Sequence, residues 1–139
     1  MVYPIYLKYK HNYEMSLEMV QQILDEKTLI FQRTQPKAMK NDGERVTGGE
    51  SSNALEDYAI EMEEHRINER LEEAKSLLED RELLMKKKEV ELRLSSNLYD
   101  KIFCMRVLDG MDIKDISEKI AYSESHTYRM VKKMIKNEN

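Results

Sequence analysis

The last third of the chain carries side chains of the types that bind nucleic acid. Between Arg129 and Lys136 there are four basic residues and no acidic one. Lys and Arg donate hydrogen bonds to phosphate oxygens, and an arginine such as Arg129 can bond both acceptors on the major-groove edge of a guanine. A carboxylate such as that of Glu124 accepts from the amino group of a cytosine. These residue types, spaced as on one helix, predict contact with DNA.

Nine positions on the predicted last helix and its N-cap form the candidate DNA-binding set. The lysines suit phosphates, and the serines suit either phosphates or base edges. The same basic run would also suit a solvated helix end, where cations favour the C-terminal end of the helix dipole. DNA contact is favoured because the run coincides with the helical pattern described next. The set is Ser123, Glu124, Ser125, His126, Tyr128, Arg129, Lys132, Lys133 and Lys136.

Two helices joined by a tight turn are predicted to present this set. Asp112 lies where its side chain can accept hydrogen bonds from first-turn amides, as Asp does in a capping box. The first helix then covers 113–120, residues 121–122 make the turn, and Ser123 caps a last helix that runs to about residue 135. This order is that of a helix-turn-helix, in which the second helix enters the major groove of DNA.

The spacing within the motif also predicts which residues are buried. Ser117 falls where the two helices approach closely and a small side chain is needed. Ala121 falls at the turn position that favours a positive φ, for which glycine is the best residue. The positions predicted to face the core are Ile116, Ile120, Tyr122, Thr127 and Met130.

A further helix is predicted before the motif, and the two together make residues 95–139 the predicted DNA-binding module. Ser95-Ser96-Asn97 offers N-caps, and Gly110 ends the helix. Cys104 is the one cysteine of the chain, so no intramolecular disulfide can form, which fits a reducing cytoplasm. Because Cys104 lies in an apolar stretch, we expect a buried and unreactive thiol. The residues predicted to point inward are Leu98, Ile102, Met105 and Leu108.

Residues 54–94 contain neither glycine nor proline and favour helix by composition. They predict one long amphipathic helix, or two helices with a break near Leu78 to Arg81. The segment resembles a coiled coil in the middle, whereas charged core positions weaken both ends. It either packs on the N-terminal helix of the same chain or pairs with a second chain as a homodimer. The register places Ile60, Ile67, Ala74, Arg81 and Lys88 at d and Glu64, Leu71, Leu78, Met85 and Leu92 at a.

The charged side chains of this segment predict ion pairs on its exposed face. Acidic residues precede basic ones at helical spacing, which is the favourable order within a helix. The predicted pairs are Glu82 with Lys86, Glu89 with Arg93, Glu63 with Arg66 and Glu72 with Lys75.

The first 53 residues divide into a helix and a linker. Residues 1–33 predict an N-terminal helix that begins at Pro4 or later. Residues 34–53 hold three of the four glycines and predict a flexible linker containing glycine and serine. Ser52 or Asn53 would then cap the following helix. The apolar face of the first helix is predicted to contain Tyr6, Tyr13, Leu17, Val20, Leu24 and Phe31.

Composition supports an all-α protein with a thin core. Charged residues make up 36% and hydrophobic residues 40% of the 139 residues, a balance that suits helices with much of their surface in water. The net charge of −4 gives no overall attraction to nucleic acid, so a DNA-binding surface must be local. The sequence contains no run of about 18 apolar residues, so no membrane span is predicted. The N-terminus lacks the pattern of a secretory signal.

The C-terminal pattern resembles a known family. Residues 115–123 (Asp-Ile-Ser-Glu-Lys-Ile-Ala-Tyr-Ser) followed by Thr127-Tyr128-Arg129 resemble the helix-turn-helix of sigma-factor region four. The layout of the whole chain, with Gly48-Gly49-Glu50-Ser51-Ser52 in the loop, is similar to the RinA and ArpU group of phage transcriptional regulators. The resemblance implies a cytoplasmic protein of a bacterium or phage that binds double-stranded DNA and contacts RNA polymerase. Ser117 and Ala121 depart from the Ala and Gly that such motifs often use.

Two other functions remain open at this point. A small terminase-type subunit for DNA packaging also joins a helix-turn-helix to an oligomerising helical region. A helical protein-interaction module would use residues 54–94 as its partner surface and would not bind DNA. An enzyme is not expected, because the histidines His11, His65 and His126 lack ligand spacing and no catalytic pair stands out. For the same reason no metal site and no cofactor are predicted.

Overall fold

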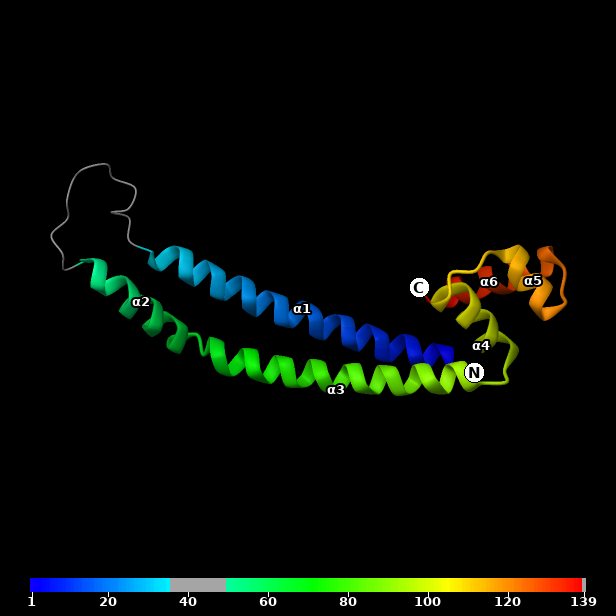
Figure 1. Cartoon of the computed structure of the whole chain (residues 1–139), viewed down its shortest axis with the longest axis horizontal. Coiled ribbons are helices and arrows are strands. Elements are labelled where there is room, and N and C mark those ends of the chain that lie inside the picture. Colours follow the sequence, from blue (N-terminus) through cyan, green and yellow to red (C-terminus); the bar gives the residue numbers. More distant parts are fainter. Residues whose placement is uncertain (36–49, 139) are drawn as a thin grey trace, which may run out of the picture. The chain divides into compact units, whose positions relative to one another are not determined.

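The computed structural model describes residues 1–35 and 50–138, with side chains placed within 1–35 and 53–136. No strand occurs in these ranges, so the all-α prediction is confirmed for the described part of the chain. In the same part, no helix is both long and apolar enough to cross a membrane. The elements, in chain order, are α1 (Tyr3–Thr34), α2 (Glu50–Glu64), α3 (Ile67–Leu94), α4 (Leu98–Phe103), the π-helix η2 (Cys104–Leu108), α5 (Ile113–Ile120) and α6 (Glu124–Glu138) (Figure 1).

The chain forms two compact units, and α1 and α3 contribute to both. The middle unit comprises Met15–Glu79, and the terminal unit comprises Met1–Glu14 together with Asp80–Asn139. Most of the predicted linker, residues 36–49, lies outside the described residues. The last part of that prediction is wrong, because α2 begins at Glu50. Ser52 and Asn53 therefore lie inside the helix and not at its N-cap position.

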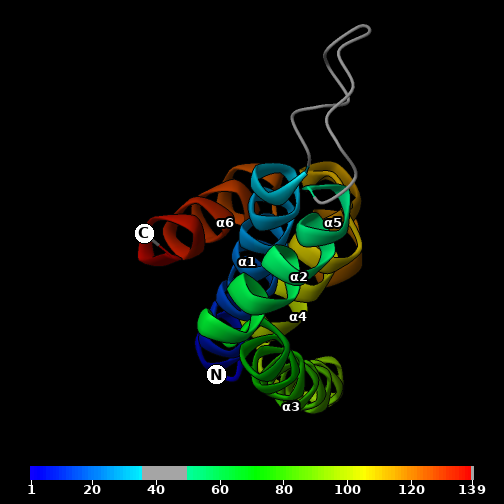
Figure 2. The ribbon, with the colours of Figure 1, turned by 90° about the vertical axis from the view of Figure 1, so that its left-hand side faces the viewer.

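The middle unit is held by an apolar seam between α1 and the helices α2 and α3 (Figure 2). Ile67, Leu71 and Ala74 are buried there, as the middle of the predicted heptad register requires. Arg70 pairs with Glu26 across the seam at 2.9 Å between Nη2 and Oε2. The hydrogen bond from Arg70 lowers the pKa of Glu26, so both members of this pair are ionised at neutral pH.

The predicted apolar face of α1 is confirmed in part. Tyr6 is buried, and Val20 and Leu24 pack against the core of the middle unit, as predicted. Leu17 and Phe31 are exposed, whereas Ile23 and Ile30 are buried, so the centre of the buried line lies towards the residues one position earlier. Apolar residues occur side by side in α1, as in Ile30-Phe31, so periodicity alone did not select the face. The packing partner did.

The break in the long helical segment is also misplaced by the sequence analysis. It lies at His65–Arg66 and not near Leu78 to Arg81. Arg66 has φ 53°, a left-handed conformation that ends α2. Nothing in the composition marks this site, because the residue is neither glycine nor asparagine. Arg66 bonds Glu69 through its Nε at 2.9 Å rather than pairing with Glu63 as predicted.

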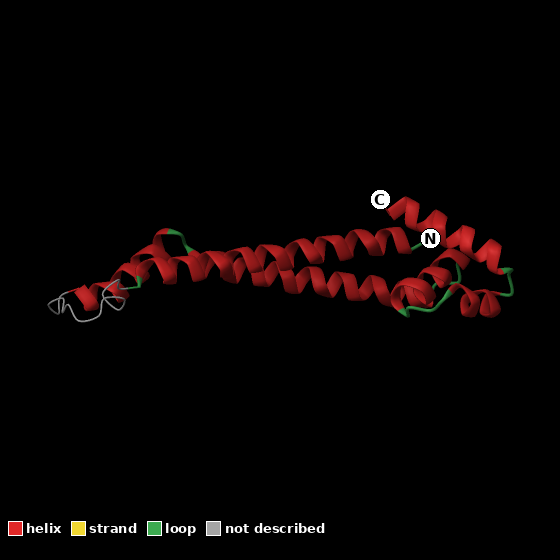
Figure 3. Cartoon of the chain, turned by 90° about the horizontal axis from the view of Figure 1, so that it is seen from above, coloured by secondary structure: helices red, strands yellow, loops and turns green. Residues whose placement is uncertain are grey.

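The terminal unit packs α4, η2, α5 and α6 against the first turns of α1 and the last turns of α3 (Figure 3). Phe103 lies at the centre of this core, with Tyr3 stacked on its ring at 5.2 Å between centroids and Tyr6 edge-on at 6.0 Å. Leu92 and Ile102 are fully buried beside them. Tyr3 and Tyr6 are thus core residues.

A buried carboxylate joins the start of α1 to α4. Asp100 is fully buried and accepts hydrogen bonds from the backbone amides of Val2 and Tyr3, each at 2.9 Å. It also accepts from the Ser95 hydroxyl at 2.6 Å. Burial alone would raise the pKa of Asp100, but these hydrogen bonds outweigh burial and lower it. Asp100 therefore caps α1 from a distant part of the chain.

Candidate nucleic-acid interface

The helix α4 and the π-helix η2 support the α5–α6 pair. Asn97 caps α4 as predicted, accepting from the amide of Tyr99 at 2.9 Å. Gly110 ends the segment with φ 68°, as expected of a C-terminal glycine. The turn of π-helix before it was not predicted, and it is closed by a bond from the Asp109 amide to the Cys104 carbonyl at 2.9 Å. The π-turn stands at the end of the helical segment, and no further turn follows it to reveal a shift in the apolar periodicity, so the sequence gives little sign of it.

Cys104 is buried in this region, as predicted. Its thiol donates to the carbonyl oxygen of Leu92 at 3.7 Å. Burial is the main cause of the raised pKa of Cys104. The thiolate is therefore disfavoured, which suits a packing role.

The start of α5 has the predicted cap. The Asp112 side chain accepts from the amide of Asp115 at 2.9 Å. Ile116 and Ser117 are buried on the inner side of the helix. The Ser117 hydroxyl donates to the carbonyl of Lys114 at 2.7 Å, so the small polar residue at this close approach has a partner within its own helix.

The turn between α5 and α6 has the predicted backbone form. Ala121 has φ 61° and ψ 37°, the left-handed conformation expected at this position. The amide of Tyr122 then donates to the Ser117 carbonyl at 3.2 Å, which satisfies one of the last carbonyls of α5. The backbone reverses within three residues and α6 begins at Glu124.

Tyr122 itself corrects the sequence analysis, which placed it in the core. Its side chain is 44% exposed. The ring lies edge-on to His126, with 5.2 Å between the ring centroids. The partly buried Ile120 already packs against the core at this end of α5, so the turn directs the tyrosine outward. An exposed aromatic pair therefore stands at the start of α6.

The beginning of α6 is tied to Ser123. The Ser123 hydroxyl accepts from the amide of His126 at 3.2 Å, which confirms the predicted cap. Thr127 donates through its hydroxyl to the Ser123 carbonyl at 2.9 Å and is fully buried. Further along the helix, Met130, Val131 and Met134 are buried in the core of the terminal unit. These contacts hold one side of α6 against the unit over most of its length.

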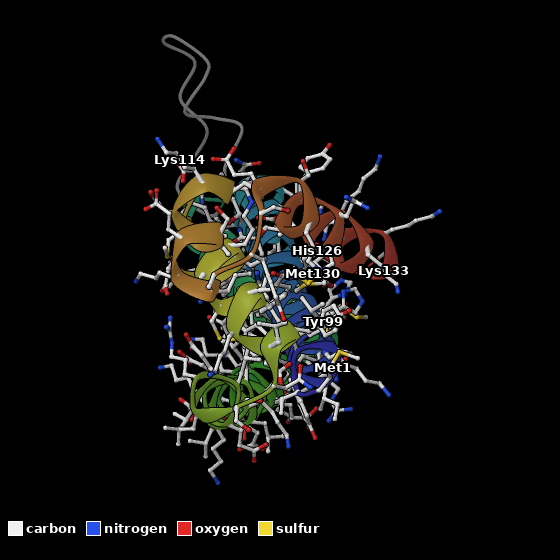
Figure 4. The ribbon with its side chains drawn as sticks, turned by 90° about the vertical axis from the view of Figure 1, so that its right-hand side faces the viewer. Met1, Tyr99, Lys114, His126, Met130 and Lys133 are labelled. Atoms are coloured by element: carbon white, nitrogen blue, oxygen red, sulfur yellow. The ribbon has the colours of Figure 1, made fainter. Side chains whose placement is uncertain are left out.

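All nine candidate residues are exposed. At 100° per residue, Ser125, Arg129, Lys132 and Lys136 fall along the middle of the side opposite the buried one, with Tyr128 on one flank and Lys133 on the other. Figure 4 shows Met130 on the side of α6 that faces the unit and Lys133 on its outer side. Six of the nine predicted residues therefore share the outer surface of α6, whereas Ser123 is its N-cap and Glu124 and His126 lie on opposite flanks of its first turn.

Comparison with known proteins adds no relative to this picture. No protein-family model, no curated protein and no solved structure matches the chain. Within the described residues, no group of three or more His, Cys, Asp and Glu side chains is placed to hold a metal ion.

Proposed function

We propose that the protein is a sequence-specific DNA-binding transcriptional regulator of the phage or prophage type, with α5 and α6 as a helix-turn-helix. One observation carries the proposal: six of the nine candidate residues share the exposed outer side of α6, while the opposite side of that helix is buried. A helix held in this way can enter the major groove as a rigid body. The left-handed turn at Ala121 and the cap at Ser123 set the angle between the two helices.

The order of side chains along α6 suits the groove. In a helix-turn-helix, the N-terminal part of the second helix meets the base edges. Glu124, Ser125, Tyr128 and Arg129 occupy that part, and the three lysines follow towards the C-terminus. We assign base contacts to the first group, with Arg129 on a guanine, and phosphate contacts to Lys132, Lys133 and Lys136.

The resemblance to phage regulators supports a cytoplasmic protein that regulates the transcription of phage genes. Contact with RNA polymerase and pairing of two chains through residues 54–94 belong to the same proposal. A single module of this size binds DNA weakly, so either contact would raise its affinity at a promoter.

The test separates base contacts from phosphate contacts. Arg129→Ala should cost about 1–3 kcal/mol on the selected site and relax specificity there. Lys133→Ala should weaken binding similarly on all sequences and make the salt dependence shallower by about one unit of slope. Lys75→Ala is the matched control, because Lys75 is exposed on α3 in the middle unit. Equal losses for the first two variants on specific and random DNA would contradict the assigned roles.

The site itself should be found by selecting bound fragments from the source genome and any resident prophage. An enriched motif upstream of phage genes that is lost with Arg129→Ala supports the regulator. Enrichment at a packaging site would favour the terminase-type subunit instead. No enrichment, even at low salt, would refute DNA binding and leave a helical interaction module.

A further inference from the structure

The helix α3 is apolar on two opposite sides within the terminal unit. Leu92 is 1% exposed in the core, and Met85 packs against the same core. On the opposite side lie Leu83, Val90 and Leu94, which are 55%, 58% and 80% exposed. A helix that only packed on α1 would carry polar residues on this outer side. We call Leu83, Val90 and Leu94 the outer stripe.

The outer stripe has the spacing of a coiled-coil seam. Leu83, Lys87, Val90 and Leu94 follow one another at intervals of four, three and four residues, which is the d-a-d-a order of a heptad. This register differs from the one predicted from the sequence, in which Met85 and Leu92 take core positions. Lys87 is the one charged residue in the seam, and its aliphatic stem can cover apolar surface while its ammonium group reaches water.

Charges beside the outer stripe indicate what packs on it. In this register Lys86 and Arg93 take g positions and Glu91 takes an e position. In a parallel pair of α3 helices, a residue at a g position of one copy faces the residue at the e position five places later in the second copy. Lys86 of each copy therefore meets Glu91 of the other copy. In an antiparallel pair, g faces g and Lys86 meets Arg93. The pattern is thus self-complementary only in the parallel arrangement.

We propose that the outer stripe is a self-association surface on which a second copy of this chain packs in parallel through α3. The charges involved are free to reach across, because the side chains of Lys86 and Glu91 are 64% and 56% exposed and their bonds to Glu82 and Lys88 lie within the same helix. Packing on α1 already orders α3, so little helix has to form on association.

The association should be weak. Three apolar residues on less than four turns give an interface at the low end of specific protein contacts. We expect a dissociation constant on the order of 10–100 μM. The outer stripe rests on the proposed function in one respect, because it gives the proposed pairing of two chains a defined surface. Its test needs no DNA, so a failure here would leave the proposed DNA contacts of α6 standing.

Sedimentation equilibrium of the full chain, from about 5 to 500 μM, tests the surface across the expected range. Val90→Glu places a charge at the centre of the stripe and should leave only monomer at every concentration. Leu55→Glu is the matched control, because Leu55 is as exposed as Leu94, at 80%, but lies on α2. It should leave the dimer unchanged, and circular dichroism should show both variants folded.

Lys86→Glu tests the direction of pairing. In the parallel arrangement a carboxylate at position 86 faces Glu91 of the second copy, so the dissociation constant of the dimer should rise roughly 3- to 10-fold. The double variant Lys86→Glu/Glu91→Lys restores opposite charges and should restore the wild-type constant. Tighter association of Lys86→Glu would mean that position 86 faces Arg93 and would overturn the parallel arrangement. A wild type that stays monomeric, or a dimer that Val90→Glu leaves intact, would overturn the surface itself.

Discussion

Replacement of Asp100 by alanine should destabilise the protein more than any other single change of a charged residue in the terminal unit. The carboxylate accepts from the amides of Val2 and Tyr3 and from the Ser95 hydroxyl, at 2.6 to 2.9 Å, and it is fully buried. Asp100→Ala removes the acceptor that these three donors share. Loss of a helix cap costs about 0.5–2 kcal/mol, and each buried unsatisfied donor about 1–3 kcal/mol.

Some of these donors will find water when the side chain is removed, so the separate costs do not add in full. We expect a loss of about 3–5 kcal/mol in the free energy of unfolding, which is a large part of the total for a domain of this size. The start of α1 should also fray, because its first amides lose their partner.

Urea unfolding followed by circular dichroism measures this loss, and amide hydrogen exchange at residues 2–6 localises it. Asp109→Ala is the matched control, because the Asp109 side chain is 44% exposed and bonds Arg93 at the surface. It should change stability by less than about 0.5 kcal/mol. If Asp100→Ala fell within about 1 kcal/mol of this control, or if exchange at Val2 and Tyr3 were unchanged, the capping argument would be wrong.

Three further outcomes follow from the same unit. Folding lowers the pKa of Asp100, so the stability that its ionised carboxylate contributes is complete above the unfolded pKa of about 3.9 and is lost as the pH falls through the folded pKa. The urea midpoints of wild type and Asp100→Asn should therefore begin to converge below about pH 4. Ala121→Gly should stabilise by about 0.5–1 kcal/mol in thermal melts, since glycine adopts φ 61° without strain, whereas Ala59→Gly in α2 should destabilise by about as much. Buried Cys104 should react with a disulfide reagent at least roughly 100-fold more slowly in the native protein than in urea, and an equal rate would contradict its burial.

The local features of the α5–α6 pair were predictable from the sequence. The Asp112 and Ser123 caps and the left-handed Ala121 each depend on residues only a few positions apart. The exposure of the candidate set followed from the helical period, because Thr127 and Met130 define the buried side. Short-range hydrogen bonds and periodicity are the signals that a single sequence carries most directly.

Features that depend on distant partners were not predictable in this way. Asp100 stands on α4 beside the charged Lys101, and only the hydrogen bonds from the α1 amides explain why this carboxylate is buried. The outward turn of Tyr122 depends on Ile120 occupying the space near the core. The rotation of α1 in the middle unit was likewise decided by which of two adjacent apolar residues met the opposite helix.

The same distant contacts bear on the proposed reading of DNA by α6. The predicted module of residues 95–139 contains α4 to α6, but its core also contains Tyr3, Tyr6 and Leu92 from outside that range. Tyr3 stacks on the ring of Phe103 and Tyr6 packs edge-on against it. Asp100 accepts hydrogen bonds from the start of α1, the helix that carries both tyrosines. A fragment starting at residue 95 would expose Phe103 and leave Asp100 with few partners. Because Met130, Val131 and Met134 rest on the same core, the position of the exposed face of α6 depends on the first turns of the chain as much as on the turn at Ala121.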